Sequence, residues 1–230
     1  MKMIEEYFHR SKALAGKRVV ITAGPTQEKI DPVRYFTNHS SGKMGYAIAE
    51  AAKQMGAEVT LVSGPTTMKP PVGVEYVPVT SASDMFEAVN EILPSADIII
   101  KAAAVADYRP KVTYQQKRKK QPGEWSIEME RTVDILQTLA NKKTPAQVIV
   151  GFAAESENML EYAKSKLEKK NLDLIVANNI SEAGSGFKGD TNQITIIHRN
   201  GEVKPFPMLT KKEAAIRVLE ETLIHVKKVN

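Results

Sequence analysis

Residues 37–45, TNHSSGKMG, have the residue types of an anion-binding turn. Apolar residues at helical spacing follow in AIAEAAKQMG. A helix N-terminus carries unpaired N–H groups and about half a positive charge, so phosphate or an acyl phosphate is the expected ligand. Gly42 and Gly45 would allow close backbone approach, and Ser40 and Ser41 would add hydroxyl groups. An ordinary serine cap with turn glycines explains these residues equally well.

The glycine spacing argues against a nicotinamide cofactor. A dinucleotide fingerprint needs its first and third glycines about five residues apart, whereas seventeen residues separate Gly24, at the end of the first predicted strand, from Gly42. Tyr162 and Lys166 have the spacing of the short-chain dehydrogenase pair, but they lie in a lysine-rich helix where such pairs arise by chance. A Rossmann-like NADP-dependent oxidoreductase remains the alternative, with Lys69 as its only basic residue near the end of the second strand.

The basic character of the chain is local. Residues 109–123 carry six positive charges and no acid, and without them the net charge of +5 would become −1. This argues against a surface that coats nucleic acid and favours a cationic flap over a triphosphate, where it would stabilise charge developing on pyrophosphate. A nucleotide- or RNA-binding module without catalysis is a third hypothesis, but Tyr108, Tyr114 and Trp125 are too few for a stacking platform.

Acidic and amide side chains near predicted strand ends are further candidates. Asp107 follows the fourth strand and could bind ribose, hold magnesium or cap a turn, and Glu155 has the same ambiguity. Asn38 and residues 178–179 could bind an acyl or carboxylate oxygen, or only satisfy loop backbone. Neither acid has a nearby histidine in the sequence, so no Ser/His/Asp triad is readable.

Composition restricts the class of protein. The 230 residues are 42% hydrophobic and contain no cysteine, which excludes disulfides and thiolate zinc sites. No apolar run approaches the roughly 20 residues of a membrane helix, and the N-terminal MKMIEEYFHR is too charged for a secretory signal. A cytoplasmic location is therefore expected.

Strand and helix patterns alternate along the chain. Near-continuous apolar strands separated by helices indicate a parallel sheet covered on both faces. The expected fold class is α/β, a Rossmann-like doubly wound, mostly parallel sheet with an edge hairpin near residues 193–206 and a basic flap. Residues 25–41 read as a long polar loop. Helices are predicted at about 4–14, 43–55, 81–93, 134–142, 157–170 and 210–228.

Most of the unusual residues lie in loops that follow predicted strands. Ligands of open parallel sheets bind beyond the carboxyl ends of the strands, so these loops are expected to form one site. The loops span residues 24–41, 63–71, 102–131, 152–156 and 178–191.

Taken together, these loops resemble phosphopantothenoylcysteine synthetase, the C-terminal half of a bifunctional bacterial coenzyme A biosynthesis protein. The segment ITAGPTQEKIDPVRYFTNHSSGKMGYAIAEA matches its opening, and AAAVADYRP, KRKK, GFAAES, KKNLDLIVANN and GFKGDTNQ follow in the family's order. The resemblance covers residues 16–225, which implies a single synthetase domain over 16–230. Residues 1–15 resemble the helical linker to a flavin-dependent decarboxylase half, so the chain is expected to be an excised half; a free-standing enzyme, whose sequence would be almost identical, is the alternative.

The resemblance implies a two-step ligase, phosphopantothenate–cysteine ligase. The carboxylate of phosphopantothenate would attack the α-phosphate of CTP, and the amine of cysteine would then attack the acyl-cytidylate. Bacterial members typically use CTP and eukaryotic members ATP, with magnesium, and the family is generally a homodimer. No protein nucleophile is needed, because positioning and charge stabilisation carry such catalysis.

The resemblance also implies roles for particular residues. Asn38 would handle the acyl-cytidylate in the cysteine step, Arg34 would hold an anionic group beside it, and Lys117 would be needed to form the intermediate. The chain has Thr132-Val133-Asp134-Ile135 where many members have Asn-Pro-Asp-Ile, and its flap is shorter, which weakens the CTP assignment first. Substrate or nucleotide contacts are expected at Gly24, Ser40, Ser41, Gly42, Met44, Gly45, Lys101, Ala102, Ala103, Asp107, Val133, Asp134, Ile135, Leu136, Phe152, Lys166 and Lys170, with Asp107 the one candidate metal ligand.

Overall fold

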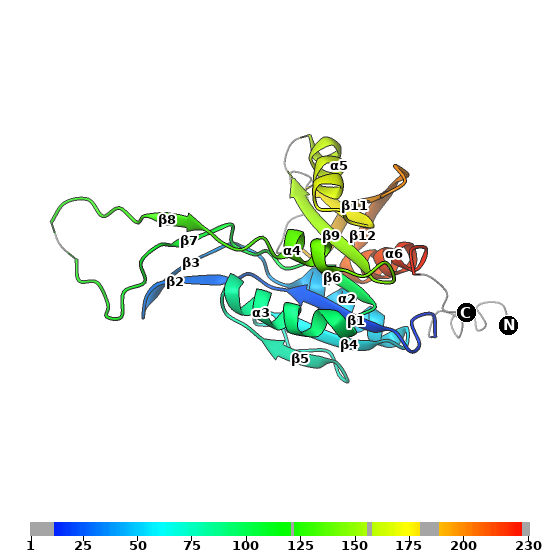
Figure 1. The fold of residues 1–230 in the computed structure, drawn as a ribbon, viewed down its shortest axis with the longest axis horizontal. Helices are drawn as coiled ribbons and strands as arrows, with labels where there is room; N and C mark the ends of the chain where they lie inside the picture. The colour runs from blue at the N-terminus through cyan, green and yellow to red at the C-terminus, as the bar shows by residue number, and fades with distance from the viewer. Residues whose placement is uncertain (1–11, 121, 156–157, 180–188, 227–230) are drawn as a thin grey trace.

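An eight-stranded sheet forms the centre of the molecule in the computed structural model, which describes residues 12–120, 122–155, 158–179 and 189–226 (Figure 1). Its order is β12-β11-β10-β9-β6-β1-β4-β5, parallel from β5 to β10, with β11 and β12 antiparallel at one edge. The predicted fold class and edge hairpin are confirmed. The strands are β1 (Arg18–Ala23), β4 (Glu58–Ser63), β5 (Glu75–Pro78), β6 (Ile98–Lys101), β9 (Val148–Glu155), β10 (Leu174–Asn179), β11 (Thr191–His198) and β12 (Val203–Thr210).

Helices cover both faces of the sheet. In the described residues they are α2 (Lys43–Gln54), α3 (Ala82–Ile92), α4 (Ile135–Lys142), α5 (Met159–Lys169) and α6 (Lys211–Leu223). Successive residues of a strand point to opposite faces, so Ile98 and Ile100 pack in the cluster with α2 and α6, whereas Ile99 packs with α3, α4 and α5. This explains why the strands are almost continuously apolar.

The strand order reverses next to β1. Strand β1 pairs with β4 on one side and with β6 on the other, and such a switch point opens a crevice at the carboxyl ends of the strands. Helix α2 begins close to the end of β1. A side chain at Gly45 would place its Cβ 2.5 Å from the Cβ of Ala23, so only glycine allows the helix to pack this closely.

The prediction of a long polar loop at residues 25–41 is wrong, because most of this segment forms a β-hairpin. Strands β2 (Gln27–Asp31) and β3 (Arg34–Thr37) pair in a separate two-stranded sheet. The sequence of this hairpin has no alternation of apolar and polar residues, so neither strand shows an apolar face. Its turn is formed by a side chain, because Asp31 Oδ1 accepts hydrogen bonds from the N–H groups of Val33 and Arg34.

A second small ladder lies beside the hairpin. Strands β7 (Tyr108–Pro110) and β8 (Met129–Arg131) pair at the two ends of the predicted basic flap. Figure 1 shows β2, β3, β7 and β8 projecting together from one side of the molecule. We call residues 27–37 and 108–131 the arm, and the rest of the described chain the body.

The chain ends were predicted as helices. Residues 1–11 lie outside the described residues, and residues 12–16 form a turn in which the N–H of Ala15 donates to the carbonyl of Lys12. The last helix ends at Leu223, short of the predicted boundary. Among the described helices, none has both the length and the apolar character that a bilayer crossing requires.

Candidate functional site

Two cavities adjoin at the carboxyl edge of the sheet and share Lys101, Val105, Asp107 and Lys166. The first, which we call the trough, has a volume of about 230 Å³. It is lined by residues 40–45, residues 101–105, Asp107, residues 152–154, Lys166, Asn178, Asn192 and Lys211. The second, the basic pocket, has a volume of about 540 Å³. It is lined by Lys101, Val105, Asp107, Tyr108, residues 131–136, Tyr162, Ser165, Lys166, Lys169 and Lys170.

These cavities bring together most of the residues predicted for the site. The loop that leads from the β2–β3 hairpin into α2 and the loop after β6 meet the last residues of β9 in the trough, as expected for ligands at a switch point. The trough contains Ser40, Ser41, Gly42, Met44, Gly45, Lys101, Ala102, Ala103, Asp107, Phe152 and Lys166. The basic pocket adds Val133, Asp134, Ile135, Leu136 and Lys170. The roles assigned to them stay predictions.

The loop before α2 is held by its own polar groups and differs from an ordinary serine cap. The N-cap residue is Gly42, at φ 78°, and no side chain caps the helix there. Asn38 Oδ1 accepts a hydrogen bond from Ser40 N–H at 3.0 Å, and Ser40 Oγ accepts one from Gly42 N–H at 3.3 Å. The first turn of α2 therefore faces the trough without a side-chain cap.

Asn38 lies next to the trough but does not line it. Its Nδ2 donates to the carbonyl oxygen of Ala104 at 2.5 Å, and Ala104 is a trough residue. Gly24 also lies outside both cavities. It is buried at φ 73°, its carbonyl accepts from the N–H of Ala104 at 2.9 Å, and an added Cβ would meet the carbonyl of Gly64 at 2.9 Å. Gly24 shapes the loop that borders the trough.

Lysines dominate the electrostatics of both cavities. The pKa of Lys101 is lowered to about 8, mainly by desolvation and next by the charge of Lys166, while Asp134 and Asp107 oppose the shift. The Lys166 ammonium donates to the carbonyl of Phe152 at 3.0 Å. Among the described residues, no hydrogen bond or ion pair engages the ammonium of Lys101, so it is available to an anion in either cavity.

Lys170 and Asp134 form an ion pair at the rim of the basic pocket. Lys170 Nζ lies 2.5 Å from Asp134 Oδ2, while Asp134 Oδ1 caps α4 by accepting from Gln137 N–H at 3.0 Å. Burial would raise the pKa of Asp134, but the hydrogen bonds from Lys170 and Gln137 outweigh it and lower the pKa. The pair fixes one lysine in the cavity wall.

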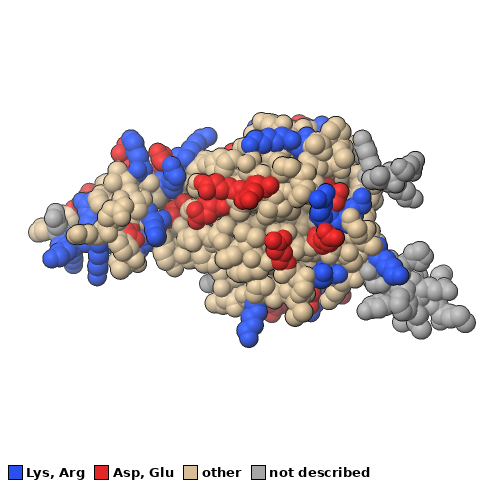
Figure 2. All heavy atoms as spheres, turned by 60° about the horizontal axis from the view of Figure 1, so that its bottom comes forward, with Lys and Arg blue, Asp and Glu red and all other residues tan. Residues whose placement is uncertain are grey.

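Arg34 and Lys117 lie elsewhere, in the arm. Arg34 pairs with Asp31 at 2.5 Å, donates to the carbonyl of Arg118 at 2.8 Å and stacks 4.5 Å from the ring centre of Trp125. Lys117 is exposed beside Arg118. Figure 2 shows Lys and Arg side chains gathered over the end of the arm, whereas Asp and Glu occupy the middle of this face. The structure does not bring these two cations into the trough or the basic pocket of the same chain.

Several residues that line the trough were not predicted from the sequence. Lys43 stands between two predicted residues, so its position was a usable signal. Asn192 and Lys211 come from β11 and the start of α6, which the sequence presented only as edge and packing elements. The antiparallel hairpin returns the chain to the carboxyl edge of the sheet, and this brings the start of α6 to the trough.

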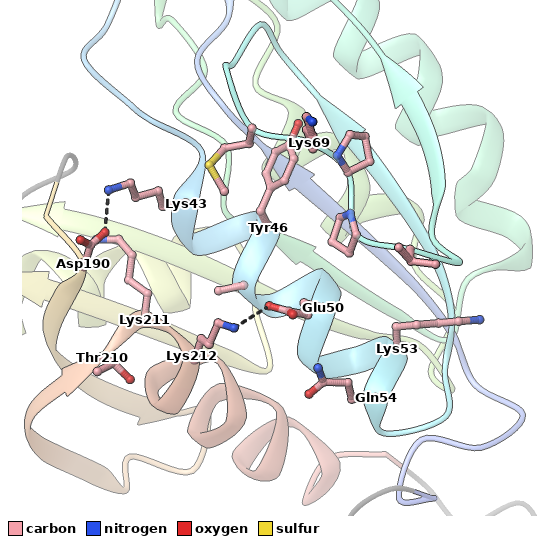
Figure 3. Close-up of a pocket in the computed structure, with 15 residues that line it drawn as sticks. Lys43, Tyr46, Glu50, Lys53, Gln54, Lys69, Asp190, Thr210, Lys211 and Lys212 are labelled. Carbon is pink, nitrogen blue, oxygen red and sulfur yellow. Dashed lines mark hydrogen bonds and ion pairs between the residues drawn. The ribbon is translucent and has the colours of Figure 1, made fainter.

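A third cavity adjoins the trough between α2, α6 and the loop after β4 (Figure 3). This α2–α6 groove has a volume of about 720 Å³ and was not predicted. The described residues contain no group of three or more His, Asp or Glu side chains placed to hold a metal ion. The side chains of Glu155 and Asn179 lie outside what the structure describes.

The sequence of the chain is similar to a known protein family and to characterised bacterial proteins. The sequence pattern of the DNA/pantothenate metabolism flavoprotein C-terminal domain matches residues 14–225. The coenzyme A biosynthesis bifunctional protein CoaBC of Bacillus subtilis (strain 168) is 51% identical over 224 residues, which are 96% of this chain and 55% of that protein. The chain spans about half the length of the curated relatives it matches.

Solved structures agree with this result. The crystal structure of the C-terminal domain of CoaBC superposes with a TM-score of 0.80 at 52% identity, covering 93% of this chain and 97% of that one. A Cab2 mutant in complex with phosphopantothenate-cysteine has a TM-score of 0.73 at 16% identity, covering 98% and 92%. The second likeness shows the fold alone.

Proposed function

Because the chain belongs to the family of the DNA/pantothenate metabolism flavoprotein C-terminal domain, we propose that it is the phosphopantothenate–cysteine ligase half of a bifunctional coenzyme A biosynthesis protein. The names of its relatives support a role in coenzyme A biosynthesis. The observation that carries the proposal is the trough, where residues 40–45, at the start of α2, line the same cavity as Lys101 and Lys166 at the switch point of the sheet. We propose that the reaction takes place in the cytoplasm. In the parent protein, this ligase half would be joined to a flavin-dependent decarboxylase half.

In the first half-reaction, a carboxylate oxygen of phosphopantothenate attacks the α-phosphorus of CTP. The new O–P bond forms as the bond to the bridging oxygen breaks, and pyrophosphate leaves with the electron pair. Lys101 and Lys166 stabilise the charge that develops on the phosphates, and the loop of residues 40–45 positions these phosphate groups. The acid becomes reactive because its oxygen is now part of a good leaving group.

In the second half-reaction, the amine of cysteine attacks the acyl carbon. A C–N bond forms, the acyl C–O bond breaks, and CMP leaves with the electron pair while the amine loses a proton. Asn38, tied to the trough through Ala104, is proposed to orient the acyl-cytidylate for this attack. This is a role in positioning.

Magnesium is proposed to accompany CTP. It usually binds through one or two carboxylates and substrate phosphates, and Asp107 at the junction of the two cavities is a fitting single ligand. When bound, the ion would neutralise phosphate charge. The ligands of a protein-only magnesium site are not assembled among the described residues.

A homodimer is proposed because Arg34 and Lys117 lie in the arm. Tyr35 and Phe36 on β3 are 51% and 46% exposed, which supports a contact between the arm and a second copy. If the arm completes the partner's trough, mixing inactive Arg34→Gln and Asn38→Asp chains should restore activity to about a quarter of wild type through random pairing. No recovery in mixtures shown to exchange subunits would reject this arrangement.

The ligase proposal is tested by mass spectrometry. The protein is incubated with phosphopantothenate, CTP and magnesium, first without and then with cysteine, and in parallel with ATP or with NADPH. We expect acyl-cytidylate without cysteine and phosphopantothenoylcysteine with it. NADPH oxidation without nucleotide consumption would instead support the oxidoreductase alternative, which the comparisons do not favour.

A further inference from the structure

Two lysines separate the trough from the α2–α6 groove. Lys43, the first residue of α2, and Lys211, the first residue of α6, line both cavities. Figure 3 shows both side chains at one end of the groove, next to Asp190, while Lys212 pairs with Glu50 farther along. An anion between Lys43 and Lys211 would therefore be reached from either cavity.

The charges at this boundary are unequal. Lys43 Nζ lies 2.6 Å from Asp190 Oδ1, and Asp190 is the carboxylate that lines the groove at this end. Lys211 is 7% exposed, and its Nζ donates to the amide oxygen of Asn192 at 2.9 Å. Burial lowers the pKa of Lys211, and the nearby charge of Lys43 lowers it further. The two ammonium groups thus repel each other, and the carboxylate of Asp190 attracts both.

The ion pair of Lys43 with Asp190 is suited to exchange. The Asp190 side chain is 88% exposed, so water and salt weaken the pair and its loss costs the fold little. A phosphate group carries more charge than a carboxylate and accepts several hydrogen bonds, so it would compete well for Lys43. A multiply charged anion would also relieve the repulsion between Lys43 and Lys211.

We propose that Lys43 and Lys211 bind the pyrophosphate that leaves in the first half-reaction, and that Asp190 holds Lys43 in place until this anion arrives. The inference rests on the proposed function, which supplies pyrophosphate when the bond between the α-phosphorus and its bridging oxygen breaks. The α2–α6 groove then gives pyrophosphate an exit that does not cross the basic pocket.

The test is calorimetric titration of the protein with sodium pyrophosphate, which does not require turnover. Lys43→Gln and Lys211→Gln remove one charge each, and we expect each to weaken binding about tenfold or more, as for the loss of one charge-assisted contact. Asp190→Asn should tighten binding severalfold, because the competing carboxylate is gone. The control is Lys212→Gln, which removes a neighbouring charge that lines the groove but not the trough, and it should stay within about twofold of wild type.

The outcomes separate this inference from the proposed function. Wild-type protein that does not bind pyrophosphate, or Lys43→Gln and Lys212→Gln that weaken binding equally, would overturn the pyrophosphate site even if the ligase turns over. The predicted pattern without any acyl-cytidylate would retain the anion site and reject the ligase. If buried Lys211→Gln fails to fold, Lys43→Gln and Asp190→Asn, at two less buried positions, still decide the question.

Discussion

The body and the arm are stabilised by different interactions. In the body, Ile98, Ile99 and Ile100 are fully buried, and the hydrophobic effect holds the sheet between its helices. In the arm, Tyr35 is half exposed, and the side-chain contacts include ion pairs and the cation–π contacts of Arg34 and Arg118. The body thus carries the stability, whereas the arm presents charge that its own chain does not use in the trough.

The largest expected effect comes from Lys117→Gln in the arm. By the proposed role, the variant should lose about 100-fold or more in the rate of acyl-cytidylate formation, the size of effect seen when one transition-state donor is removed. Its melting temperature should stay at the wild-type value, because Lys117 is exposed. Rapid-quench assays and calorimetry measure the two quantities. Lys120→Gln is the control, and equal losses in both variants would refute a specific role.

The next effect is on stability and belongs to the body. Gly45→Ala should lower the free energy of unfolding by about 1–3 kcal/mol, because its Cβ would overlap Ala23. Gly123→Ala in the arm meets nothing within 4 Å, and its cost is the backbone strain at φ 95°, about 1 kcal/mol. Urea denaturation measures both. An arm variant as damaging as the body variant would contradict the division between the two regions.

The same contrast explains what the sequence could predict. Strands such as ADIIIKAAA have an apolar pattern that is typical of a strand buried on both faces. Helix α3 begins with a capping box of Ser81 and Asp84, which is a signal local to the sequence. The hairpin of the arm was missed because its turn depends on the side chain of Asp31 and its strands have no apolar face. Local periodicity does not report such contacts.

For the site, the sequence predicted the loops that line the trough but not the contribution of β11 and α6, which lie far along the chain. The trough residues after β1 and β6 followed from the rule for parallel sheets. Lys211 was missed because its place depends on the antiparallel hairpin, which no local pattern near α6 encodes. Arg34 and Lys117 were assigned to the site by resemblance. That they lie outside the trough depends on the direction in which the arm projects, which the sequence does not indicate.

A smaller effect concerns the pH dependence of nucleotide binding in the body. The pKa of Lys101 is about 8 in the absence of ligand, and bound phosphates would raise it. The ammonium that attracts phosphate is therefore lost as pH rises through 8, and affinity for CTP should fall about tenfold between pH 7 and 9. Calorimetry at several pH values measures this. Lys101→Met should bind more weakly at pH 7 with a flatter profile, and an unchanged slope would exclude Lys101 as the cause.

The smallest effect is an acid transition confined to the arm. The hydrogen bond from Arg34 lowers the pKa of Asp31 from 3.8 to about 2. Because this pKa is lowered in the folded state, the stabilisation is present above pH 3.8 and is lost as pH falls towards 2. Trp125, the only tryptophan, contacts Arg34, so its fluorescence should change before the far-ultraviolet circular dichroism of the body.

The matched control for the acid transition is Asp31→Asn, which removes the titrating group. Its fluorescence should be altered already at neutral pH and should show no transition below pH 4. If wild-type fluorescence and circular dichroism change together, the arm does not respond independently of the body.

The central claim is that a nucleotide is transferred onto the substrate carboxylate at the trough. It is tested most directly with phosphopantothenate labelled with ¹⁸O in its carboxylate, incubated with CTP, magnesium and cysteine. The account predicts that one ¹⁸O atom appears in the phosphate of CMP and none in pyrophosphate. Label in pyrophosphate or inorganic phosphate, or CMP without label, would contradict it.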